Sequence, residues 1–78
     1  MPTILRVGPY RLFFYSSDRS EPVHVHVQRD RAVAKFWVLP VALDGSYGFG
    51  RAELREIERI VEKNRDQIIR GWNEFFEE

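Results

Sequence analysis

The chain has 78 residues, of which 44% are hydrophobic and 14% aromatic, so it is long enough for one small folded domain and its composition excludes a disordered chain. Its 12 basic residues balance 12 acidic ones, and it contains no cysteine, which excludes disulfides and thiolate zinc sites. No apolar run approaches the roughly 20 residues that cross a membrane, and the N-terminus lacks the pattern of a signal peptide, so we expect a cytoplasmic protein without membrane contact.

The residue pattern of positions 3–28 predicts three strands joined by short connections. Residues 3–7 predict the first strand, and residues 8–9, glycine followed by proline, predict a tight turn. Residues 10–16 are rich in aromatic side chains and predict the second strand. Residues 17–22 are polar and predict a loop, after which residues 23–28 predict the third strand.

The third predicted strand contains both histidines of the chain. Successive side chains of a strand point to opposite faces, so Val23, Val25 and Val27 share one face while His24 and His26 share the other. We expect the valine face to be buried against a helix and the histidine face to remain open. Histidine titrates near physiological pH and serves as an acid, a base or a metal ligand, so this face is the first candidate for function.

The next segment predicts one more strand and then a loop. Residues 29–31 predict a turn and residues 32–39 a fourth strand, which Pro40 ends because proline cannot donate to a sheet ladder. Residues 41–50 contain three glycines and predict a loop. If the valines of the third strand face the helix, three residues of the fourth strand join them there: Ala34, Phe36 and Val38.

From residue 51 onward the hydrophobic period changes from two to about 3.6, which predicts a helical region over residues 51–76. Its apolar stripe consists of Leu54, Ile57, Val61, Ile68, Trp72 and Phe75. An unbroken helix of this length would extend roughly 39 Å, whereas a strand of six to eight residues spans about 20–26 Å. Asn64 interrupts the stripe, so we expect a bend there or a hydrogen bond from its side chain to the backbone.

These elements predict an α+β fold for the single domain, residues 1–78. It consists of a small four-stranded antiparallel β-meander within residues 1–40 and a long, bent C-terminal helix, or two consecutive helices, packed on one face.

The combination of these motifs resembles a family of very short bacterial proteins, known as a domain of unknown function, many of which are described as DhiT-type toxins of type II toxin–antitoxin pairs. The matching motifs are Pro2-Thr3-Ile4, Tyr10-Arg11, Phe13-Phe14-Tyr15-Ser16, residues 21–27, Ala34-Lys35-Phe36-Trp37, Tyr47-Gly48-Phe49, Glu53-Leu54, Ile57, Asn64 and residues 72–76. The resemblance implies a toxin that is neutralised by a small antitoxin protein encoded beside it. It does not imply particular catalytic residues.

The histidine pair fits metal-independent RNA cleavage. In that reaction a base removes the 2′-hydroxyl proton, an acid protonates the leaving oxygen, and cations stabilise the charged intermediate. We expect His24, His26 and Lys35 to carry these roles. The alternative is that both histidines only form hydrogen bonds within the fold, in which case the protein is a non-catalytic binding module that sequesters a protein or a nucleic acid.

A metal site on the same histidines would need a third ligand, because catalytic zinc normally takes three protein ligands and a water. The sequence offers no third histidine and no cysteine, and only Asp18 and Glu21 are nearby carboxylates. We therefore expect neither a metal nor another cofactor.

Two further groups of side chains are candidates for binding. The first 40 residues carry six basic and three acidic residues, while residues 51–78 carry six basic and eight acidic ones, a distribution typical of an anion-binding face or of a solvated surface of mixed charge. The candidate RNA-binding side chains are Arg11, Tyr15, Lys35 and Trp37. The candidate contacts with the antitoxin, or with a second copy in a homodimer, are Trp72, Phe75 and Phe76, which alternatively dock on the core.

Overall fold

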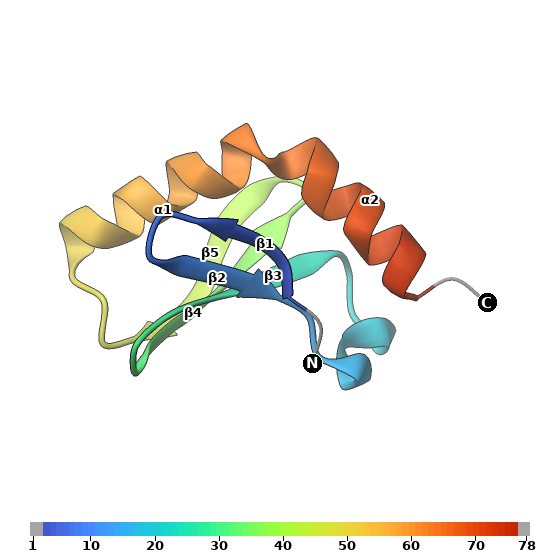
Figure 1. Cartoon of the computed structure of the whole chain (residues 1–78), viewed down its shortest axis with the longest axis horizontal. Helices are drawn as coiled ribbons and strands as arrows, with labels where there is room; N and C mark the ends of the chain where they lie inside the picture. The colour runs from blue at the N-terminus through green and yellow to red at the C-terminus, as the bar shows by residue number, and fades with distance from the viewer. Residues whose placement is uncertain (1–2, 77–78) are drawn as a thin grey trace.

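The structure is a computed structural model that describes residues 3–76 and contains a five-stranded antiparallel sheet and two C-terminal helices. Both helices lie along one side of the sheet (Figure 1). The strands are arranged in chain order, so each strand pairs with the next. In chain order the elements are β1 (Thr3–Val7), β2 (Tyr10–Phe13), the 3-10 helix η1 (Ser16–Ser20), β3 (His24–Arg29), β4 (Ala32–Val38), β5 (Val41–Tyr47), α1 (Arg51–Lys63) and α2 (Arg65–Phe75).

The sheet has five strands and not the predicted four. Residues 41–47, predicted to be part of a loop, form β5, which pairs with β4 and forms one edge of the sheet. Most side chains of β5 are exposed, so this strand lacks the alternation of buried and exposed residues from which a strand is predicted. Its strand conformation is stabilised by hydrogen bonds to β4, and these depend on a neighbour that the local sequence does not specify.

The second strand is shorter than predicted, and the connection after it is ordered. β2 ends at Phe13, and η1 replaces the predicted end of that strand and most of the predicted loop. The Asp18 carboxylate accepts the backbone N–H of Tyr15 at 2.8 Å, and the Asp18 N–H donates to the Tyr15 carbonyl at 3.0 Å. These two hydrogen bonds close the first turn of η1, which begins at Ser16 directly after the extended Tyr15.

The predicted bend at Asn64 is confirmed. α1 ends one residue before Asn64 and α2 begins one residue after it. The side-chain amide of Asn64 donates to the Ile60 carbonyl at 2.8 Å, and the backbone N–H of Asn64 donates to the same oxygen at 3.1 Å. The polar residue in the apolar stripe therefore satisfies a carbonyl at the end of α1, where the chain changes direction.

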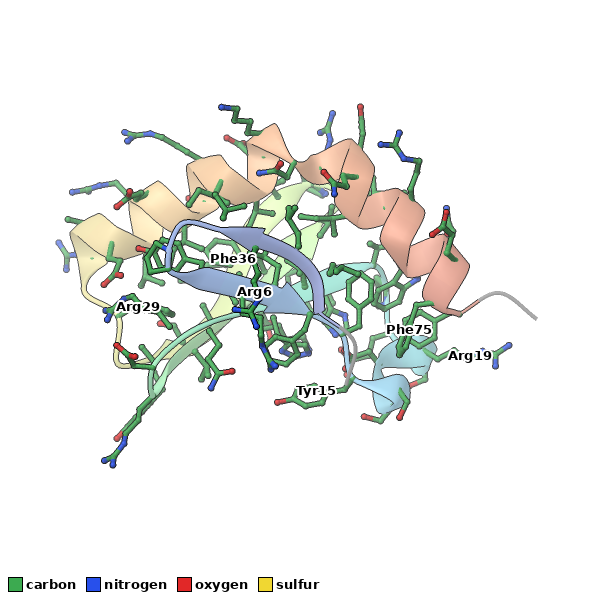
Figure 2. The ribbon with its side chains drawn as sticks, in the orientation of Figure 1. Arg6, Tyr15, Arg19, Arg29, Phe36 and Phe75 are labelled. Atoms are coloured by element: carbon green, nitrogen blue, oxygen red, sulfur yellow. The ribbon has the colours of Figure 1, made fainter. Side chains whose placement is uncertain are left out.

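The hydrophobic core lies between the sheet and the helices. Figure 2 shows Phe36 in this layer, beneath α1. The predicted alternation is confirmed for β3 and β4, because Val25 and Val27 are fully buried in the core, whereas His26 and Lys35 pair on the opposite face. The buried residues of the core are Tyr10, Leu12, Phe14, Val25, Val27, Ala34, Phe36, Val38, Ile57, Val61, Ile68 and Trp72.

The first turn of α1 is tied to the sheet by polar contacts. Arg29, at the end of β3, donates two hydrogen bonds to the Glu53 carboxylate, at 2.7 and 2.9 Å, and the Tyr10 hydroxyl donates to the same group at 2.7 Å. The hydrogen bonds from Arg29 and then from Tyr10 lower the pKa of Glu53. Over the described residues, neither helix has the length and apolar character that a membrane span requires.

Candidate functional site

The sheet surface opposite the core and α1 carries most of the predicted site residues, and we call it the histidine face. Residues directly opposite each other on neighbouring strands share a face. The register places Arg6 opposite Arg11, Phe13 opposite His26, His26 opposite Lys35, and His24 opposite Trp37. The histidine face therefore includes Arg6, Arg11, Phe13, His24, His26, Lys35 and Trp37.

His24 is fully buried, so the expectation that both imidazoles are open is wrong for this residue. Its Nδ1 lies 2.8 Å from the Pro22 carbonyl, and its ring packs 5.5 Å from Trp37 and 5.2 Å from Trp72, between ring centroids. Trp72 belongs to α2, so the C-terminal helix covers the beginning of β3. Strand alternation could not reveal this cover, because it comes from a residue 48 positions later in the chain.

His26 is more accessible than His24, with 17% of its side chain exposed. Its Nε2 lies 3.0 Å from Oδ2 of Asp18, while the Phe13 ring stacks on it at 5.4 Å and the Tyr15 ring packs edge-on at 4.6 Å. Burial lowers the pKa of His26 from its ordinary value of 6.5, although the Asp18 carboxylate acts in the opposite direction. Near neutral pH the imidazole is therefore mostly uncharged.

Asp18 connects the two histidines. Its Oδ1 lies 3.2 Å from Nε2 of His24, and its Oδ2 contacts His26 as described above. Burial acts to raise the pKa of Asp18, but the N–H of Tyr15 and the two imidazoles outweigh burial and lower it. From the sequence alone, Asp18 is a candidate only as a third metal ligand. The one local signal for its position is an aspartate in a polar segment, which commonly hydrogen-bonds a nearby backbone N–H.

Lys35 is held on the histidine face by acidic neighbours. Its Nζ donates to Oε1 of Glu21 at 2.7 Å and lies 3.7 Å from Oδ2 of Asp44. The ammonium group also lies 4.7 Å from the centre of the Trp37 ring. The hydrogen bond to Glu21 raises the pKa of Lys35, so this residue is a fixed cation and not a base at neutral pH.

A shallow pocket of about 200 Å³ brings three of the predicted site residues together. Tyr15, His26 and Lys35 line it, beside Phe13 and Ser46. In Figure 2 the Tyr15 side chain lies on the side of the sheet away from the helices. The pocket thus combines aromatic rings, an imidazole and an ammonium group on one surface.

The other two predicted RNA-binding residues lie outside this pocket. Trp37 lines a separate apolar pocket of about 220 Å³ with Val23 and Leu39. The guanidinium of Arg11 lies 4.2 Å above the centre of the Phe13 ring, and its Nε is buried without a hydrogen-bond partner. Arg11 is therefore held by an aromatic ring next to the pocket.

The C-terminal aromatic side chains dock on the core, which is one of the two alternatives that the sequence left open. Trp72 is buried and packs edge-on against Phe14, with ring centroids 5.1 Å apart. Phe75 and Phe76 are half-buried and lie 5.9 and 6.2 Å from the same ring. Their part in binding a partner stays a prediction.

Comparison with known proteins gives one match. The model of a protein family described as a domain of unknown function (DUF4160) matches residues 10–73, which include the strands of the histidine face from β2 onward and most of both helices. No curated protein and no solved structure matches the chain.

Proposed function

The chain belongs to the DUF4160 family, whose description assigns no activity, and we propose that it binds single-stranded RNA on the histidine face. The observation that carries this proposal is the pocket in which Phe13, Tyr15, His26 and Lys35 meet. Single-stranded RNA is bound by aromatic side chains on which its bases stack and by cations that follow its phosphates. The pocket offers both kinds of group side by side.

Two arginines extend the positive charge beyond the pocket. Arg6 and Arg11 lie opposite each other on β1 and β2, and Arg6 is exposed. Among the ion pairs of the described residues, none includes Arg6 or Arg11. A phosphate that binds Arg6 or Arg11 therefore displaces no carboxylate among the described residues. At Lys35 it competes with the carboxylates of Glu21 and Asp44.

Burial of His24 favours RNA binding without cleavage. Cleavage by a pair of histidines needs both imidazoles at the reacting atoms, one as base and one as acid. His24 has no exposed surface, so it reaches a substrate only if Trp72 and η1 move away. Cleavage remains a second candidate function because the Asp18 carboxylate orients the His26 ring, as an acidic group does for the general base of many enzymes.

We further propose, from the resemblance to DhiT-type toxins, that RNA binding makes the protein toxic and that an antitoxin protein blocks it. The exposed parts of Phe75 and Phe76 are the proposed antitoxin contact, because phenylalanine is a good interface anchor. Trp72 supports this surface from below, through a ring contact of 4.4 Å with Phe76.

RNA binding is tested directly with a fluorescently labelled RNA of about 12 nucleotides, a length suited to one small binding surface. We expect Tyr15→Ala to weaken binding by about tenfold, because stacking on an aromatic ring contributes about 1–3 kcal/mol per base. The double variant Arg6→Gln, Arg11→Gln should also bind more weakly and show a smaller dependence on salt. Arg59→Gln, in the middle of α1, is the matched control and should change neither quantity.

The state of the RNA distinguishes the two candidate functions. Intact RNA after incubation with the wild-type protein supports binding alone, whereas cleavage that His26→Gln abolishes supports the second candidate. The absence of binding at low salt contradicts the proposal. Expression of the chain alone and together with its neighbouring gene tests the toxin assignment, because a toxin arrests growth only when it is expressed alone.

A further inference from the structure

Three metal-binding side chains converge where η1 meets the beginning of β3. Asp18, His24 and His26 each offer one ligand atom, and these three atoms lie within 4.8 Å of one another. The carboxylate oxygens of Asp18 are 3.2 Å from Nε2 of His24 and 3.0 Å from Nε2 of His26. Two ligands of a tetrahedral zinc ion, each about 2.0–2.1 Å from the metal, lie about 3.3 Å apart. Each of these two separations, one to each oxygen of Asp18, is therefore already close to that of two ligands on one zinc ion.

The surroundings of His24 fix which of its nitrogens can bind a metal. Nδ1 lies 2.8 Å from the Pro22 carbonyl, which can only accept a hydrogen bond, so Nδ1 carries a proton. In the neutral imidazole the lone pair is then on Nε2, the nitrogen that faces Asp18. Histidines that bind metals commonly donate their second ring N–H to a backbone carbonyl in this way, which holds the ring in place.

Nε2 of His24 lacks a hydrogen-bond partner in its buried position. Within residues 3–76 the atom has almost no solvent-accessible surface and no hydrogen-bond partner, although Oδ1 of Asp18 is only 3.2 Å away. Two atoms that both present lone pairs repel each other at this distance unless a cation lies between or beside them. Either an additional proton on His24 or a metal ion provides that cation.

We propose that Asp18, His24 and His26 form a binding site for one zinc ion. Two imidazole nitrogens and one carboxylate oxygen are ligands that zinc prefers, and three protein ligands leave a fourth position for water. Lys35, which lies opposite His26 on β4, is paired with Glu21 and Asp44, so two carboxylates offset its charge. The site shares His26 with the RNA-binding pocket, but it includes neither Arg6 nor Arg11.

The folded chain, freed of metal with a chelator, is titrated with zinc chloride by calorimetry. We expect one zinc ion per chain and a higher melting temperature that the chelator reverses. Asp18→Asn and His26→Gln should each weaken zinc binding at least about tenfold, because each removes one of three ligands. Asp44→Asn is the matched control: it removes a carboxylate on the same face that does not contact the cluster, and it should leave the affinity nearly unchanged.

A second measurement does not depend on how the variants fold. In the wild-type protein labelled with ¹⁵N at histidine, zinc should shift the Nε2 resonances of both imidazoles and leave Nδ1 of His24 protonated. The proposal is overturned if the wild-type chain takes up no zinc, or if zinc leaves both Nε2 resonances unchanged. It is equally overturned if folded Asp18→Asn and His26→Gln proteins bind zinc as tightly as the wild type.

Discussion

Asp18 of η1 and His26 of β3 are joined by a contact of 3.0 Å between Oδ2 and Nε2. The same oxygen accepts the backbone N–H of Tyr15 at 2.8 Å. Oδ2 of Asp18 therefore links η1 to Tyr15, which follows β2, and to His26 of β3. The second contact holds the His26 ring at the pocket. Loss of this contact changes both the stability of the fold and the shape of the histidine face.

Stability should decrease in mildly acidic solution. Burial lowers the pKa of His26 below 6.5, so the unfolded chain takes up a proton at a higher pH than the folded protein does. The stability that follows from this difference is present above pH 6.5 and is lost as the pH falls through the pKa of folded His26. The lowered pKa of Asp18 acts in the same direction below 3.8, the ordinary value for aspartate. Melting temperatures measured between about pH 8 and pH 5 with a chelator present should therefore fall toward acid.

His26→Gln is the control for this pH dependence. The variant lacks the titrating imidazole, so its melting temperature should fall less between about pH 7 and pH 5 than that of the wild type. An equally steep decrease in both proteins would assign the pH dependence to other groups.

Replacement of the two histidines should have unequal effects on stability. His24→Ala leaves a cavity among Trp37, Trp72 and the Pro22 carbonyl, and we expect it to lower the free energy of unfolding by about 2–4 kcal/mol. His26→Ala removes a partly exposed ring and should cost less. Urea unfolding of both variants in the presence of a chelator measures the difference, and a larger loss for His26→Ala would contradict the burial described here.

Trp72→Ala should destabilise the fold by about 3–5 kcal/mol, because the indole ring is buried against Phe14 and covers His24. Trp72→Phe retains part of this packing and should cost less. Asn73→Ala, at the next position and exposed, should change the stability by less than about 0.5 kcal/mol. Thermal unfolding followed by circular dichroism provides the comparison. A Trp72→Ala protein as stable as the wild type would mean that the end of α2 is not docked in solution.

Gly48→Ala should destabilise the connection between β5 and α1. Gly48 has a φ of +89°, and a Cβ atom at this position would lie 3.0 Å from Cβ of Ala32 and 3.1 Å from its Cα. Strain and close contact together should lower the free energy of unfolding by about 1–3 kcal/mol. Gly45→Ala is the matched control, because its added Cβ meets nothing within 4 Å. Equal stability of the two variants would argue against the close approach at Ala32.

The features that depend on side-chain period follow from the order of the residues alone. Alternation separates Val25 and Val27 from His26 within one strand, because successive residues of any strand point to opposite faces. The helical period identifies residues 51–76, and the polar Asn64 in its stripe locates the break. These properties are local, so they can be read from neighbouring residues.

Other features depend on residues that are distant in the sequence and meet only in the folded chain. β5 is a strand because β4 lies beside it, although the glycines of residues 41–50 predict a loop. His24 is buried because Trp72, near the other end of the chain, packs over it. Asp18 meets both imidazoles because η1 turns its carboxylate toward β3. Each of these features results from contacts between segments that are far apart in the sequence. They therefore cannot be predicted from the spacing of residues along the chain.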